Sequence, residues 1–112
     1  MGRGEGAGVR QGAAVSHAIV LRAEARAEFD QAFDWYEEQR PGLGTDFVTK
    51  IQSTLDQIAT SPEMFPKVHG DIRVATVTRF PYSIFYRVDD FRVVVLAVFH
   101  GKRDPGIWQS RT

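Results

Sequence analysis

Basic side chains and a histidine gather in the second half of this sequence, and these residue types suit anion binding and proton transfer. They fall along or directly after three expected strands: Arg73, Arg79, Arg87, His100, Lys102 and Arg103. Arginine and lysine bind phosphate groups, and histidine exchanges a proton near neutral pH. If the strand arginines converge on the sheet face away from the helices, they form a site for a phosphate or another anion. The alternative is that each is a solvated surface charge paired with a carboxylate.

His100 also has two interpretations. It can serve as a proton donor or acceptor, or it can be a structural residue hydrogen-bonded to a backbone carbonyl. His69 follows Lys67 and Val68 and precedes Gly70, a pattern that predicts an exposed loop.

Several other kinds of site are excluded by residue type. The chain has no cysteine, which rules out disulfides, thiolate metal sites and cysteine nucleophiles and fits a cytoplasmic location. Three histidines without an acidic cluster at ligand spacing argue against a metal site, and we expect neither metal nor cofactor. There is no nucleophile elbow, phosphate loop, membrane-spanning apolar run or secretory signal core.

The length and composition fit one domain. The chain has 112 residues, of which 43% are hydrophobic, enough to bury a core. Residues 1–16 hold five of the ten glycines, which predicts a flexible tail before a folded domain at 17–112. The formal net charge is zero, but segment 17–60 carries −4 and segment 91–112 carries +3. This asymmetry predicts two unlike surfaces.

The elements that position the basic residues follow from the hydrophobic periods. The β-branched run 17–22 predicts a strand, and helical spacing then predicts a helix from Ala23 that ends before Pro41. A second helical period begins at Leu43 and stops before Ser61 and Pro62. Two amphipathic helices with a short joint predict an antiparallel hairpin.

Strand patterns fill the rest of the chain, at 72–78, 82–88 and 92–99. The last of these is apolar on both faces, which is typical of a central strand. The resulting order is β-α-α-β-β-β. We therefore expect an α+β fold in which the helical hairpin packs on one face of a mostly antiparallel four-stranded sheet.

Three segments resemble the RelE/ParE family of bacterial toxins. They are residues 32–44, residues 79–88 and the last strand with its tail at 93–105. The resemblance covers about 17–108. It implies a growth-inhibiting toxin of a type II toxin-antitoxin module (a plasmid stabilisation protein), held inactive by a cognate antitoxin, and it implies the same fold.

Members of the family that this chain resembles act by two different mechanisms, so the resemblance leaves open whether the protein is an enzyme. RelE-like members cleave mRNA in the ribosome, and here Arg73 and Arg103 match bases of such enzymes, with His100 and Arg79 able to complete the set. At other positions this sequence differs from those enzymes. It has Ser83 and Ala75 where they carry basic residues, and Trp108 in place of a C-terminal tyrosine.

ParE-like members block DNA gyrase by binding, and segment 98–104 is similar to their strand end. The zero net charge also favours this branch, because ribosome-directed proteins are usually basic. We expect a ParE-like toxin. The expected target-binding residues are Arg87, His100, Lys102, Arg103 and Trp108. The expected antitoxin-binding residues are Phe29, Phe33 and Trp35, the last of which lies off the main apolar stripe of its helix.

Overall fold

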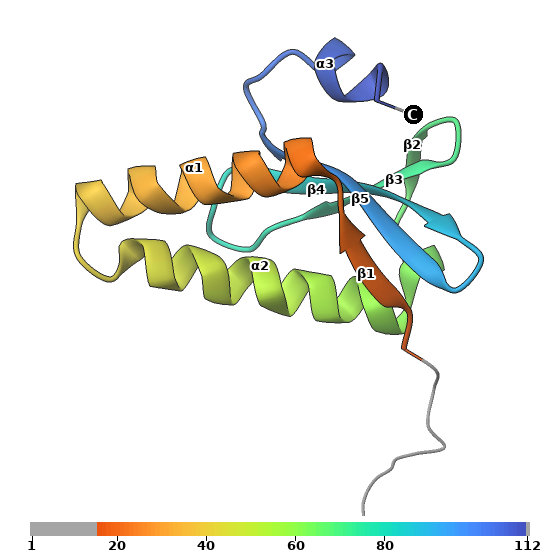
Figure 1. Ribbon diagram of the computed structural model, residues 1–112, viewed down its shortest axis with the longest axis horizontal. Helices are drawn as coiled ribbons and strands as arrows, with labels where there is room; N and C mark the ends of the chain where they lie inside the picture. The colour runs from red at the N-terminus through yellow and green to blue at the C-terminus, as the bar shows by residue number, and fades with distance from the viewer. Residues whose placement is uncertain (1–15, 112) are drawn as a thin grey trace, which may run out of the picture.

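Two long helices lie against one face of a twisted sheet in the computed structural model, which describes residues 16–111 (Figure 1). The elements are β1 (Ala18–Leu21), α1 (Ala23–Gln39), α2 (Leu43–Thr60), the 3₁₀ helix η1 (Pro62–Met64), β2 (Lys67–His69), β3 (Ile72–Thr76), β4 (Tyr82–Asp89), β5 (Arg92–His100) and α3 (Gly106–Gln109). The predicted α+β class and helical hairpin are confirmed. The predicted Gly-rich tail lies, apart from Ser16, outside the described residues.

The helical hairpin closes tightly because of its glycines. Gly42 has φ +90°, a conformation that glycine adopts without strain, and it precedes α2 directly. At Gly44 an added Cβ would lie 2.8 Å from the backbone oxygen of Phe33, so only glycine lets the two helices approach this closely. The Glu37 carboxylate accepts hydrogen bonds from the N–H groups of Gly42 and Gly44, both at 2.9 Å. Glu37 therefore caps the start of α2 from the end of α1.

The sheet has five strands in the order β1-β5-β4-β3-β2. β1 pairs parallel to β5, and the other pairs are antiparallel. Four strands were predicted, and the additional one is β2, where the sequence predicted a loop. β2 has three residues, all exposed, and it pairs only with β3, so no hydrophobic alternation marks it. β5 lies inside the sheet, as its apolar sequence predicted.

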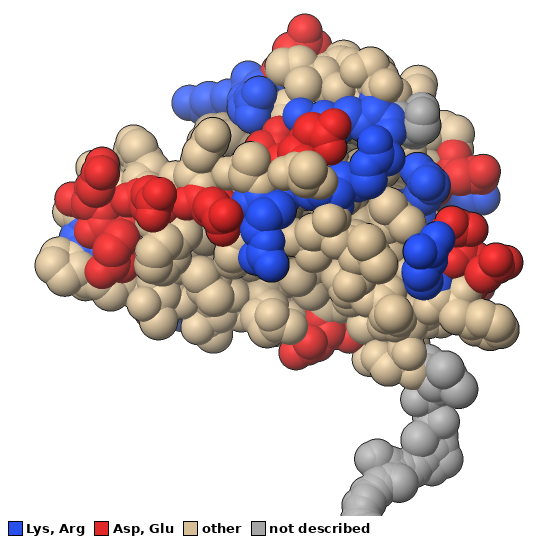
Figure 2. All heavy atoms as spheres, viewed as in Figure 1, with Lys and Arg blue, Asp and Glu red and all other residues tan. Residues whose placement is uncertain are grey.

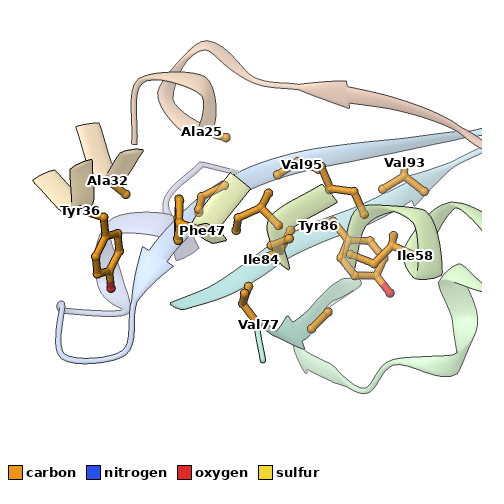
Figure 3. Packing of buried hydrophobic residues seen from close by; sticks show 14 residues of the cluster. Ala25, Ala32, Tyr36, Phe47, Ile58, Val77, Ile84, Tyr86, Val93 and Val95 are labelled. Carbon is orange, nitrogen blue, oxygen red and sulfur yellow. The ribbon is translucent and has the colours of Figure 1, made fainter. Parts of the chain in front are cut away.

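Each face of the sheet carries its own core. The helix-side core joins residues such as Phe47, Ile84 and Val95, and Figure 3 shows them between the helices and the sheet. The outer core joins Leu96, Phe99 and others to Trp108 of α3. The single turn of α3, which the sequence did not predict, thus covers a face that the helical hairpin leaves open.

A β-bulge in β5 changes which side chains of this strand point to each of the two cores. Phe85 pairs with Ala97 and Tyr86 pairs with Val95, so Leu96 has no partner residue on β4. The bulge shifts the alternation, and both Leu96 and Ala97 join the outer core. No helix within residues 16–111 is long and apolar enough to cross a membrane.

Candidate functional site

A cleft between α1 and the ends of β4 and β5 contains His100. Tyr82 pairs with His100 across the two strands, and their ring centroids lie 5.3 Å apart. Two adjoining cavities, of about 230 and 380 Å³, share Trp35, Tyr82 and His100 in their linings. Arg103 and Glu28 line the smaller one. The cleft thus combines aromatic walls with a histidine and an arginine.

The hydrogen bonding of His100 leaves one ring nitrogen, Nε2, without a partner in the described part of the chain. Its Nδ1 accepts the backbone N–H of Lys102 at 3.1 Å, so Nε2 carries the proton of the neutral ring. The partner is a backbone N–H, whereas the structural interpretation of the sequence expected a backbone carbonyl. A protonated Nε2 can donate to an anion or to a carbonyl oxygen.

Burial raises the pKa of two tyrosines near His100, Tyr82 and Tyr36. It raises the pKa of Tyr82, against the lowering effect of Arg103 and together with the raising effect of Glu28. Burial and the neighbouring Tyr82 likewise raise the pKa of Tyr36. Both phenols therefore stay neutral at physiological pH and can act only as hydrogen-bonding groups or apolar walls.

Glu28 and Arg111 organise the C-terminal segment, and sequence reasoning missed both. Glu28 is nearly buried, and its two carboxylate oxygens accept bonds from Arg111 at 3.1 and 3.0 Å. The same carboxylate accepts the N–H of Val98 at 3.1 Å, while Arg111 also donates to the Leu96 carbonyl at 3.1 Å. No local pattern joins residues 83 positions apart, so the sequence carries no signal for this pair.

The C-terminal loop presents two cations of different kinds. Arg103 lies 3.5 Å from Glu28 and stacks 4.2 Å over the Phe99 ring, which holds its guanidinium in place. Lys102 is exposed and pairs with no carboxylate in the described part of the chain. Lys102 is thus available to an outside anion without breaking an internal bond.

Of the two interpretations that the sequence left open for Arg73, Arg79 and Arg87, the structure does not show convergence on one face. Arg73 points to the helix side and donates to the carbonyls of Glu63 and Phe65, at 3.1 and 2.6 Å. Arg79 lies in the β3–β4 turn and lines a different cavity from that of His100. The reason is strand alternation: Arg73 pairs with Tyr86 of the helix-side core.

Arg87, by contrast, lies on the outer face, because its partner on β5 is Val94 of the outer core. Arg87 lies five positions along β4 from Tyr82, the partner of His100, which places Arg87 and Tyr82 roughly 17 Å apart. Arg87 therefore does not share the cleft.

The remaining predicted residues also lie apart. Trp108 is 4% exposed and stacks on Phe85 at 4.1 Å, so it anchors α3 and does not face solvent. Phe29 stacks on Phe47 at 6.0 Å and lines a groove between the helices and β1, whereas Trp35 is 56% exposed beside the His100 cleft. Phe33 is half-buried at the contact with Gly44. The three aromatic side chains do not form one patch.

Charged side chains are unevenly distributed over the face seen in Figure 2. Acidic side chains gather over the end of α1 next to the hairpin turn, whereas basic and acidic side chains are mixed over its start (Figure 2). On α1 the exposed acidic residues Asp30, Asp34 and Glu38 follow one another at a spacing of four residues. Within the described range, no group of three or more His, Asp or Glu side chains is placed to hold a metal ion.

These features define a small α+β protein of the RelE/ParE type: a helical hairpin on a sheet, with a basic loop after β5. A family profile described as the ParE toxin of the type II toxin-antitoxin system parDE matches residues 19–105. The chain belongs to this family of type II toxins. Residues 19–105 include the His100 cleft and Lys102, while Arg111 lies beyond the match.

Among solved structures, the chain is similar to one titled "Chromosomal ParDE TA system from P. aeruginosa". The TM-score is 0.67 and the identity 19%, and the match covers 76% of this chain and 96% of that chain. At this identity the likeness supports the fold. No curated protein matches the chain.

Proposed function

We propose that this protein is a cytoplasmic toxin that inhibits DNA gyrase by binding it, and that a cognate antitoxin neutralises it. One observation favours binding over cleavage. Of the four side chains that a nuclease mechanism would draw on, only His100 and Arg103 line a common cavity. Arg73 is engaged by carbonyls elsewhere, and Arg79 lines another cavity. A ParE-like toxin needs no such convergence, because it acts by contact.

The proposed contact surface is the loop after β5. Lys102 supplies an unpaired charge, and Ile107 of α3 adds a side chain that is 40% exposed. Trp108 packs α3 onto the sheet and so positions the loop without facing the target. An exposed charge such as Lys102 is typical of the polar rim of an interface, where it steers association, and Ile107 adds apolar surface near it.

A supercoiling assay with purified gyrase tests this proposal. The wild-type chain should inhibit, and Lys102→Ala should weaken inhibition by at least about tenfold. Lys67→Ala is the matched control, because Lys67 is also exposed but pairs with Asp71 at the opposite edge of the sheet. Its inhibition should stay within about twofold of wild type. Absence of inhibition by the wild-type chain would refute gyrase as the target.

Ribosome-dependent mRNA cleavage is the second candidate function. It is favoured by the His100 cleft, where a protonated Nε2 and Arg103 lie together beside Tyr82. Under this alternative, ribosome-bound mRNA is cut, and His100→Ala lowers the cleavage rate by about 100-fold or more. Uncut mRNA at saturating protein rejects it.

For the antitoxin, we propose a helix that lies along α1 and α2. The groove there has a volume of about 230 Å³ and includes Phe29, Val48 and Leu55 in its lining. An amphipathic partner helix fits such a groove, and exposed Trp35 lies on the same helix as Phe29. Coexpression with the product of the adjacent reading frame should protect the amides of α1 from hydrogen exchange. A stable complex with α1 unprotected would contradict this site.

A further inference from the structure

A separate cavity lies where the helical hairpin meets the β3–β4 turn. Its volume is about 430 Å³, and it is lined by Arg40, Leu43, Asp46, Thr49, Lys50, Arg79 and Phe80. These residues come from the α1–α2 joint, the first half of α2 and the β3–β4 turn. The cavity shares no lining residue with the two around His100.

The three cations of this cavity are unpaired. Arg40, Lys50 and Arg79 make no ion pair and no side-chain hydrogen bond with any residue between 16 and 111. Five other basic residues in that range do pair with a carboxylate. Asp46 is the one acid in the lining, so the cavity keeps a net positive charge. Like charges held around one cavity attract an anion.

The backbone at Arg79 is strained. Its φ of +73° lies in the left-handed region, where glycine is favoured and an arginine is not. The next residue fixes the turn, because the Phe80 ring packs against Tyr36 at 5.0 Å and Phe47 at 5.3 Å. A glycine would make the same turn without strain. An arginine at this position therefore points to a use for its side chain.

The proposed site does not rest on the N-terminus of α2. The N–H groups of Gly42 and Gly44 donate to Glu37 and that of Leu43 donates to the Arg40 carbonyl, so the basic side chains are the groups left to hold an anion. Leu43 and Phe80 add an apolar wall to the cavity. The volume falls in the range of small-molecule sites, about 300–1,000 Å³. Three cations around an apolar wall match a ligand with several anionic oxygens and an organic part.

We propose that this cavity binds an organic di- or triphosphate. The phosphate groups lie among Arg40, Lys50 and Arg79, and the organic part packs against Leu43 and Phe80. The proposal does not depend on gyrase or the ribosome as the target.

The full chain is titrated with pyrophosphate, ADP, AMP and adenosine at constant ionic strength, with backbone amides followed by NMR. Pyrophosphate and ADP should shift the amides of Asp46, Thr49 and Phe80, with dissociation constants of about 1 mM or tighter. AMP should bind more weakly, and adenosine should cause no shift. Shifts that are absent or confined to other residues overturn the proposal. So does a short oligonucleotide without terminal phosphate that shifts these amides at lower concentration than ADP.

Two variants separate a binding role from a structural one. Arg79→Gly removes the guanidinium and relieves the backbone, so it should weaken ADP binding at least about tenfold while Tm stays equal or rises. Lys50→Gln should weaken binding similarly. The control is Asp90→Gly, because Asp90 has φ +56° in the β4–β5 turn, the same kind of strain far from the cavity lining. Its ADP binding should stay within about twofold of wild type. Wild-type affinity in both Arg79→Gly and Lys50→Gln would show the proposal to be wrong.

Discussion

Tyr86 shows how one buried residue ties the sheet to the segment after α2. It is fully buried in the helix-side core, and its hydroxyl donates to the Pro62 carbonyl at 2.6 Å. Burial raises its pKa to about 12, although nearby Arg73 acts in the opposite direction. Arg73 in turn donates to the carbonyls of Glu63 and Phe65. Together the two side chains hold η1 against the sheet.

The raised pKa of Tyr86 makes a pH-dependent contribution to stability. The folded value lies above the unfolded value of 10.0, so this contribution is complete below pH 10 and is lost as the pH rises toward 12. We expect Tyr86→Phe to cost about 1 kcal/mol at pH 8, through loss of the hydrogen bond. At pH 11 the difference from wild type should shrink by about 1 kcal/mol. Urea unfolding at both pH values measures this.

Tyr82→Phe is the control for this experiment, because the Tyr82 hydroxyl makes no hydrogen bond with another residue of the described chain. Its cost at pH 8 should be smaller than that of Tyr86→Phe. A Tyr86→Phe difference that stays constant from pH 8 to pH 11 would contradict the assignment.

Residue types were easier to predict than residue positions. The sequence identified His100, Lys102 and Arg103 as neighbours at a strand end, because they are adjacent in the chain. The faces of Arg73 and Arg87 depend on the pairing of β3 with β4 and of β4 with β5, which no local pattern reveals. Glu28 and Arg111 meet only through the fold.

Where β1 ends, side chains make hydrogen bonds to the backbone of β5. β1 pairs with β5 only from Arg92 to Val95, after which the chain turns into α1. Beyond that point, Glu28 accepts the N–H of Val98, and Arg111 donates to the carbonyl of Leu96. These bonds replace those that a longer β1 would make. The same ion pair holds the end of the chain beside the sheet.

Removal of the Glu28 carboxylate should therefore destabilise both the strand and the C-terminal segment. Glu28→Ala leaves Arg111 without its carboxylate and the Val98 N–H without an acceptor, and should cost about 3 kcal/mol in the free energy of unfolding. Amide exchange at Val98 should become faster. Glu24→Ala, which breaks an exposed 4.0 Å pair with Arg22, should change stability by at most about 0.5 kcal/mol. Equal costs for the two variants would count against this role of Glu28.

Elements with strong local signals were predicted, and weakly marked ones were not. α1 and α2 begin and end close to the positions that Ala23, Pro41 and Ser61 indicated, because periodicity and helix-stopping residues are local. β2 and α3 have three and four residues, too few to show a period. Tertiary contacts hold both, through β3 and Trp108 respectively.

At the scale of the molecule, the sheet is covered unequally. The helical hairpin covers one face over two long helices, whereas the other face depends on one turn of helix and Trp108. The ring stacks on Phe85 at 4.1 Å with an interplanar angle of 20°. The outer core is thus the thinner layer, and its cover is the segment that carries the proposed target contacts.

Trp108→Ala should detach α3 from the outer face of the sheet. We expect a loss of about 3 kcal/mol in the free energy of unfolding, together with binding of a hydrophobic dye to the uncovered sheet face. The far-UV circular dichroism should hardly change, because Trp108 belongs to the outer core, whereas α1 and α2 pack on the helix-side core. Ile107→Ala, at an exposed neighbouring position, should cost less than about 1 kcal/mol and bind no dye. Dye binding by neither variant would indicate that α3 stays in place without its tryptophan.

The parallel pairing of β1 with β5 has a consequence for synthesis. Ala18 of β1 pairs with Arg92 of β5, so β1 cannot pair until the ribosome has added roughly 70 further residues. β5, which joins β1 to the other strands, is missing from any nascent chain that has emerged only as far as β4, and such a chain cannot assemble the complete sheet. The five-stranded sheet and the loop after β5 therefore form only once β5 and the residues that follow it have been made.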